Sequence, residues 1–214
     1  MQIEFIGKNT LGNIKKIISD LGAKNILLVT GKDSYKKSGS EEKIFQYLGD
    51  AVIKRFFDFE ANPNIKDVQV GINIISSFKP DLVIAIGGGS VIDIAKLINI
   101  FAVHVTKEKE IYKFVNESSS VKQPGLPLIA IPTTSGTGSE ATHFAVVYIG
   151  NKKYSFAHEY VLPNFSIIDP SLSYSNPAYI KACSGFDALS QAIESFWAVG
   201  STEESRSYSR EAIK

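Results

Sequence analysis

The change of pattern after Ile86 constrains the fold more than any other feature of this chain. The run "LVIAI" (82–86) has five apolar residues, which suits a buried strand, and it leads directly into three glycines. The following "VIDIAKLINIFA" reads as a helix. A buried strand, a glycine turn and a helix in direct succession are typical of a parallel α/β sheet.

This succession recurs in the first 132 residues of the chain. The runs "NILLVTG" (25–31), "AVIKRFFDF" (51–59) and "LPLIAIP" (126–132) read as further strands. Helical spacing follows in "SEEKIFQYLGD" and in "NIKDVQVGINIISSF", where apolar residues recur on one face. Since no hairpin turn signal separates the four strands, the sequence predicts an α/β fold with a doubly wound parallel sheet that is covered on both faces.

Downstream of residue 140 the pattern changes. We expect "FAVVYIG" (144–150) and "FSIID" (165–169) to be strands joined by the polar, aromatic segment "NKKYSFAHEYVLPN". An Asn-Pro dipeptide and several serines near Tyr174 to Pro177 indicate a loop between regular elements. From there to Lys214 the pattern is helical. The sequence therefore predicts an α/β domain at residues 1–175 and the beginning of a helical domain, truncated at its end, at residues 176–214.

The charge balance limits the class of partner. Lys and Arg number 23 against 22 Asp and Glu, so bulk charge favours neither nucleic acid nor a membrane, and we expect a small-molecule partner. The single cysteine, Cys183, cannot form an internal disulfide, and no apolar run reaches the length of a membrane span. The amino-terminal "MQIEFIGKNT" lacks the layout of a signal peptide, and we expect a cytoplasmic protein.

The glycines of "IAIGGGSVIDIAK" lie where a strand ends and a helix begins. At that point backbone N–H groups and the helix dipole can receive a phosphate without obstruction by side chains. The fingerprint G-x-G-x-x-G is incomplete, because Ile92 occupies the position of its last glycine. Two interpretations follow from this stretch: a phosphate-binding loop, or a tight turn with no ligand.

A second polar loop, "IPTTSGTGSEAT" (131–142), also follows a strand. It contains four threonines, two serines and two glycines. Hydroxyl groups and exposed amides at the carboxyl end of a strand are what the ribose and phosphates of a nucleotide need in an open α/β sheet. Two such loops at one sheet edge predict a nucleotide-binding cleft.

With "LPNFSIIDPSL" and "GFDALSQAIESF", these two loops complete four motifs that resemble the iron-containing, or group III, alcohol dehydrogenases. The motifs occur in the order of that family and span nearly the whole chain. The resemblance implies a dinucleotide-binding α/β domain of dehydroquinate synthase-like fold, followed by an all-helical domain. It also implies a divalent metal in the cleft between the two domains and a homo-oligomer, expected to be a dimer.

The resemblance assigns the cofactor-binding residues one by one. It implies that the pyrophosphate loop and its helix, the threonine-rich loop and a downstream lysine contact NAD or NADP through Gly88, Gly89, Ser90, Asp93, Thr133, Thr134, Thr137 and Lys153. The family often has an aspartate directly after the strand that corresponds to "NILLVT" (25–30). At that position this chain has Gly31, followed by Lys32. Without that carboxylate a 2′-phosphate is admissible, which favours NADPH, although Gly31 also suits a turn.

The motif "SGFDALSQAIESF" is the expected metal site. Asp187, Gln191 and Glu194 are four and then three residues apart, so a helix stacks them on one face. The family has metal ligands at an aspartate and, four residues on, a histidine, with two further histidines beyond Lys214. Asp187 matches the first ligand, but Gln191 replaces the histidine, and an amide binds Fe²⁺ or Zn²⁺ less well than imidazole. The alternative is that Asp187 and Gln191 hydrogen-bond each other or substrate.

The expected reaction is hydride transfer between a nicotinamide and a small aldehyde or alcohol, with no catalytic side chain identified. The sequence "DALSQAIESFWAVGSTEES" resembles that of the subgroup that reduces phosphonoacetaldehyde. Two alternatives stay open. The chain is a nucleotide-binding fragment without catalysis, or it is a sugar-phosphate synthase or lyase that recycles bound NAD.

Overall fold

A six-stranded parallel sheet forms the centre of the molecule in a computed structural model that describes residues 1–105, 108–116 and 121–214. The strand order is β1-β8-β5-β4-β2-β3, and every neighbouring pair is parallel. The strands are β1 (Ile3–Ile6), β2 (Asn25–Thr30), β3 (Val52–Phe56), β4 (Leu82–Gly87), β5 (Leu128–Pro132) and β8 (Phe165–Ile168).

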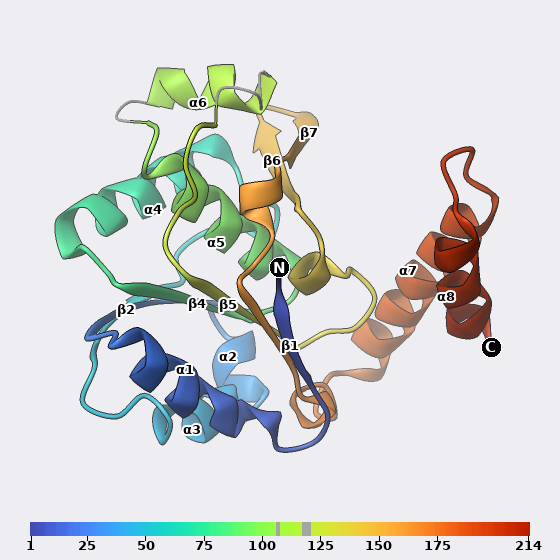
Figure 1. The fold of residues 1–214 in the computed structure, drawn as a ribbon, viewed down its shortest axis with the longest axis horizontal. Coiled ribbons are helices and arrows are strands. Elements are labelled where there is room, and N and C mark those ends of the chain that lie inside the picture. Colours follow the sequence, from blue (N-terminus) through green and yellow to red (C-terminus); the bar gives the residue numbers. More distant parts are fainter. Residues whose placement is uncertain (106–107, 117–120) are drawn as a thin grey trace.

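Helices cover both faces of this sheet, as Figure 1 shows. One face carries α1 (Asn13–Leu21), α2 (Ser34–Lys37) and α3 (Ser40–Phe45). The other carries α4 (Ile65–Phe78) and α5 (Gly89–Phe101), with α6 (Glu108–Asn116) packed on α4. The doubly wound α/β prediction is therefore confirmed.

Strand β4 shows why the sequence favours two covered faces. Val83 and Ala85 pack in the core beneath α4 and α5, whereas Ile84 and Ile86 pack in the core beneath α1 and α3. All four are completely buried, because alternate side chains of a strand enter opposite layers. Burying each large aliphatic side chain stabilises the fold by roughly 1.5–3 kcal/mol.

Helix α5 is buried along its length, since it packs against the sheet, α4 and a separate hairpin. From Val91 to Phe101 every residue is buried, including Asp93, Lys96 and Asn99. A buried charged or amide side chain is costly unless it finds hydrogen-bond partners inside the protein. These three polar side chains must therefore have internal partners.

The separate hairpin pairs β6 (Phe144–Ile149) with β7 (Lys152–Ala157) in antiparallel register. The expectation that "NKKYSFAHEYVLPN" only joins two strands was wrong, because its first half forms β7. Phe156 is 1% exposed and Tyr154 packs on the same core, so the alternation in this segment is that of a half-buried strand. Strand β1 and helix α6 were also not predicted.

Two antiparallel helices, α7 (Ala178–Trp197) and α8 (Glu203–Ile213), stand beside the α/β body (Figure 1). Helix α7 begins directly after Pro177, and α8 begins with a capping box formed by Thr202 and Ser205. The predicted change to helical structure is confirmed. Several large apolar side chains of this pair are exposed, such as Phe186 and Trp197.

Candidate active site

The carboxyl ends of β2, β4 and β5 meet at one edge of the sheet. Strand β3 follows β2 on its outer side, and β4 then returns to its inner side, so the winding direction changes between β2 and β4. Ligands of open α/β sheets bind in the crevice at such a switch point. The residues that follow these three strands are Gly31, Gly88 and Thr133.

A cavity of about 310 Å³ opens at this switch point. Gly31, Lys32 and Ser34 line it from the end of β2, and the first residues of α5 line it from the end of β4. The predicted loop residues Gly88, Gly89 and Ser90 all lie in this lining. Gly88 caps α5 without a side-chain hydrogen bond, and the N–H of Val91 already donates to the carbonyl of Gly88, so the N–H groups of Gly89 and Ser90 are those that can receive an anion.

Close packing explains the glycines of the first loop. A Cβ atom at Gly89 would lie 2.9 Å from Cγ2 of Thr137 and 3.2 Å from Oγ of Ser139. A Cβ atom at Gly88 would lie 3.1 Å from Oγ1 of Thr134. Neither glycine has a positive φ, so the turn itself does not require glycine. The threonine-rich loop therefore packs directly on the Gly88–Ser90 loop.

The threonine-rich loop also reaches α7. The carbonyl of Thr133 accepts a hydrogen bond from Nδ2 of Asn176 at 2.7 Å. Gly136 has a φ of +105° and lies so close to the carbonyl oxygen of Ser184 that a side chain would collide with it. Thr133, Thr134 and Gly136 line a neighbouring cavity of about 240 Å³. The loop thus lies between the first cavity and α7.

At Gly31 the neighbouring Ser34, and not the turn, excludes a side chain. The φ of Gly31 is not positive, but a Cβ atom there would collide with Oγ of Ser34. Arg55, from β3, donates hydrogen bonds to the carbonyl of Gly31 at 3.0 Å and to that of Lys32 at 3.3 Å. Arg55 is not among the predicted site residues, although the sequence "KRFF" places a cation beside aromatic residues at a strand end.

The predicted cofactor residues Asp93 and Lys153 lie beside each other on α5 and β7. Asp93 is 8% exposed, and its Oδ2 accepts a hydrogen bond from the N–H of Val146 at 3.1 Å. Burial raises the pKa of the Asp93 carboxyl, whereas the N–H of Val146, the charge of Lys96, the Ser139 hydroxyl and, least of all, the exposed Lys153 act to lower it. Asp93 therefore faces the hairpin, whereas Lys153 is open to solvent.

The predicted metal residues hydrogen-bond each other. Nε2 of Gln191 donates to Oδ2 of Asp187 at 3.1 Å and to the carbonyl of Gly136 at 3.0 Å. Within residues 1–105, 108–116 and 121–214, no three His, Cys, Asp or Glu side chains form a group that could hold a metal. One carboxylate and one amide do not fit Fe²⁺ or Zn²⁺ by themselves.

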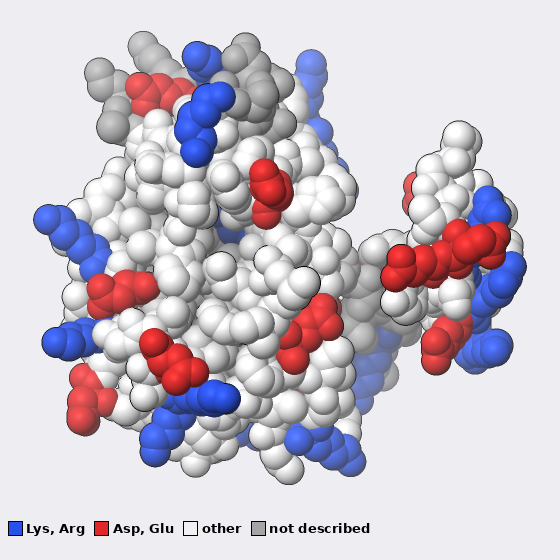
Figure 2. All heavy atoms as spheres, viewed as in Figure 1, with Lys and Arg blue, Asp and Glu red and all other residues white. Residues whose placement is uncertain are grey.

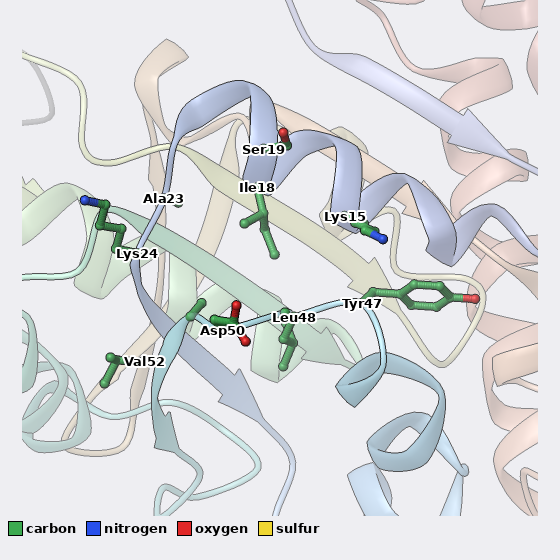
Figure 3. Close-up of a pocket in the computed structure, with 11 residues that line it drawn as sticks. Lys15, Ile18, Ser19, Ala23, Lys24, Tyr47, Leu48, Asp50 and Val52 are labelled. Carbon is green, nitrogen blue, oxygen red and sulfur yellow. The ribbon is translucent and has the colours of Figure 1, made fainter.

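A larger cavity, of about 540 Å³, lies at the opposite end of the sheet. Figure 3 shows it between α1, which contributes Ile18, and the segment that carries Tyr47 and Leu48. Ala23 and Val52, at the amino-terminal ends of β2 and β3, complete its wall. Ligands of open α/β sheets bind at the carboxyl ends, so this cavity is not the candidate site.

Charges of both signs are interspersed on the face shown in Figure 2, over the α/β body and over α7 and α8. This agrees with a small-molecule partner, because binding through bulk charge needs a patch of one sign. Among the helices described, none is long and apolar enough to cross a bilayer.

A switch-point cavity, a glycine loop at a helix start and a threonine-rich loop packed on it are features of α/β proteins that bind dinucleotides. The chain belongs to the iron-containing alcohol dehydrogenase family, which it matches over residues 3–170. This confirms the resemblance seen in the motifs.

Three relatives illustrate the family. The chain is 32% identical over 214 residues to long-chain-alcohol dehydrogenase 1 of Geobacillus thermodenitrificans, covering 99% of this chain and 54% of the relative. It is 33% identical to the NAD-dependent methanol dehydrogenase of Bacillus methanolicus, with 98% and 55% covered. The structure of sulfoacetaldehyde reductase from Bifidobacterium kashiwanohense with NAD⁺ superposes with a TM-score of 0.91 at 32% identity, covering 99% and 56%. The chain spans about half the length of the curated relatives it matches.

Proposed function

We propose that this protein is an NAD(P)H-dependent alcohol dehydrogenase or aldehyde reductase that transfers hydride to a small aldehyde. The contact between the Gly88–Ser90 loop and the threonine-rich loop at the switch point carries this proposal. The amides of Gly89 and Ser90 bind the pyrophosphate, and Thr133, Thr134, Thr137 and Lys153 line the rest of the cofactor. The nicotinamide supplies the hydride chemistry, and the protein sets its distance from the aldehyde carbon.

Cofactor binding and turnover test this proposal separately. Quenching or shifting of NADPH fluorescence measures binding, and the fall in absorbance at the nicotinamide band measures turnover. Net oxidation of NADPH in proportion to aldehyde supports the reductase. Binding without turnover of any aldehyde supports a nucleotide-binding fragment. Product formation without net oxidation supports a synthase or lyase that recycles its cofactor.

We propose NADP(H) as the preferred cofactor. The residue after β2 is Gly31, so no carboxylate at that position repels a 2′-phosphate, and the one carboxylate in the cavity lining is that of Glu60. Lys32 lines the same cavity, and the Arg55 guanidinium lies behind it, between the rings of Tyr35 and Phe57 at 4.8 and 4.4 Å. Lys32 also lies 3.7 Å from Asp58, but both side chains are exposed, which keeps that ion pair weak. A lower Kd for NADPH than for NADH is the expected result.

For the substrate we propose a small anionic aldehyde, with phosphonoacetaldehyde as the first candidate. The sequence around Gln191 supports this choice, because it resembles the subgroup that reduces phosphonoacetaldehyde. The similarity to a sulfoacetaldehyde reductase also supports it. Both aldehydes have two carbons and an anionic head group. Comparing kcat/KM for phosphonoacetaldehyde, sulfoacetaldehyde and the uncharged butanal tests this choice. Equal values for all three would contradict an anion-selective site.

The domain division and the assembly are part of the same proposal. We place the α/β domain at residues 1–175 and helical structure at 176–214, with α7 beginning at Ala178. A homodimer is expected, and sedimentation equilibrium measures it. Asp187 and Gln191 hold a metal only together with further ligands, so metal analysis of the purified protein decides between the two interpretations of that pair.

A further inference from the structure

The hairpin β6–β7 and the loop before it supply one wall of the proposed cofactor site. Thr134 and Thr137 precede the hairpin, and Lys153 lies on its second strand. The hairpin is not part of the six-stranded sheet. Its position relative to the Gly88–Ser90 loop therefore depends on contacts other than the main ladder.

The outer edge of β6 shows what these contacts are. In an antiparallel pair, alternate residues direct their N–H and C=O groups to the partner strand and away from it. The carbonyl of His143 points to the partner strand, because it accepts a hydrogen bond from the N–H of His158. Residues 142, 144, 146 and 148 thus face the other edge, where no strand of the described part of the chain pairs and only Tyr148 forms a single bridge, to Asn64. An edge of this kind must find other hydrogen-bond partners when it is buried.

Two charged side chains of α5 provide most of those partners. Nζ of Lys96 donates to the carbonyls of Thr142 at 2.7 Å and Phe144 at 2.8 Å. One turn earlier, Oδ2 of Asp93 accepts from the N–H of Val146 at 3.1 Å. The cation meets two carbonyls and the anion meets an amide, so each charge matches the backbone group in front of it. The N–H of residue 148 bonds to a carbonyl before α4.

We propose that Lys96 and Asp93 are positioning residues, which dock the outer edge of β6 on α5 and thereby hold Thr137 and Lys153 at the pyrophosphate loop. The same helix begins at Gly89 and carries both side chains, so one rigid element fixes the two walls of the site relative to each other. This inference rests on the proposed cofactor function. It gives the buried lysine and aspartate a role that needs no direct contact with the nucleotide.

Burial opposes the charge of Lys96, and two neighbouring carboxylates support it. Lys96 is 1% exposed, and burial lowers the pKa of its ammonium to about 8, although Asp93 and Glu140 act in the opposite direction. The other charged groups of this cluster are Lys153, which faces Asp93, and Glu4, which faces Glu140. At pH 7 the ammonium therefore keeps its charge, and the two carbonyls accept charge-assisted bonds.

NADPH titration of the full chain tests the proposal. We expect Lys96→Met to weaken NADPH binding at least tenfold with an unchanged far-UV circular dichroism spectrum, and the exposed-site control Lys152→Met to bind as the unmodified protein does. An unchanged Kd for NADPH in folded Lys96→Met overturns the proposal.

Hydrogen exchange separates this proposal from the proposed function. Without nucleotide, Lys96→Met should accelerate exchange at the amides of Val146 and Tyr148 but not in β4. If the unmodified protein binds neither NADPH nor NADH while exchange rises as expected, the proposed function fails and the docking of β6 stands. If exchange at Val146 is unchanged in the folded variant, the docking role itself is wrong.

Discussion

A Cβ atom at Gly89 would lie 2.9 Å from Cγ2 of Thr137, so the two loops of the candidate site touch with no space for a side chain. The pair joins the start of α5 to the loop that follows β5. Because this contact lies at the switch point of the sheet, we expect a substitution of either residue to disturb the proposed pyrophosphate site.

Replacing Gly89 by valine should abolish nucleotide binding. The branched side chain would displace the threonine-rich loop, and overpacking of this kind costs about 1–3 kcal/mol. NADPH titration should show at least a hundredfold loss of affinity. Gly200→Ala is the control, because a Cβ atom there meets nothing within 4 Å and the φ of Gly200 is not positive. Normal NADPH binding by Gly89→Val would place the pyrophosphate loop elsewhere.

The charge at position 31 should decide the cofactor preference. Any side chain there collides with Ser34, so the comparison is made in a Ser34→Ala background. Gly31→Asp should then weaken NADPH binding about tenfold relative to the isosteric Gly31→Asn, which corresponds to about 1.4 kcal/mol of charge repulsion. Binding of NADH should differ little between the two. If both nucleotides respond equally, the 2′-phosphate does not lie beside Gly31.

Removing the Gln191 amide should have only a small effect on stability. Gln191→Ala removes one hydrogen bond from α7 to the carbonyl of Gly136 and one bond within α7 to Asp187. A hydrogen bond contributes about 0.5–1.5 kcal/mol net to the free energy of unfolding, and because Gln191 is exposed we expect values near the lower end of that range. Urea unfolding measures the change. Gln46→Ala, which removes one exposed bond to a carbonyl of its own helix end, is the matched control.

Chelation should leave nucleotide binding unchanged. The residues around the switch-point cavity are glycines, hydroxyl and apolar residues, one lysine and one glutamate, and no candidate metal ligand pair lies among them. The Kd for NADPH should therefore be the same before and after dialysis against EDTA. A large increase in Kd after chelation would show that a metal supports the cofactor site.

The free energy of unfolding should depend on pH through Lys96. Its pKa in the folded protein is about 8, and in the unfolded chain it is about 10.4. Between these values the unfolded state binds more protons, so the Lys96 contribution to stability rises with pH from about 8 to 10.4 and is lost as pH falls through 8. Denaturant unfolding of Lys96→Met, compared with the unmodified protein over this range, should lack that rise. A parallel pH profile in both proteins would contradict the lowered pKa.

Local patterns determined most of the strands, the glycine loop and the fold class. The run from Leu82 to Ile86 is apolar on both faces because helices cover both sides of β4, and such a run is visible without the tertiary structure. Strand β1 escaped prediction because it is an edge strand, and Ile3 and Ile6 are exposed. Strand β7 escaped because lysines mask its alternation.

Motif order determined the family and the positions of the proposed cofactor residues, since several short sequences in register carry far more information than one. Only the tertiary structure decided what each side chain meets. It brought Ser34 against Gly31, Arg55 beneath the end of β2, and Lys96 against the outer edge of β6. These contacts join residues that are far apart in sequence or on different elements, and they depend on packing across the sheet, which no local periodicity encodes.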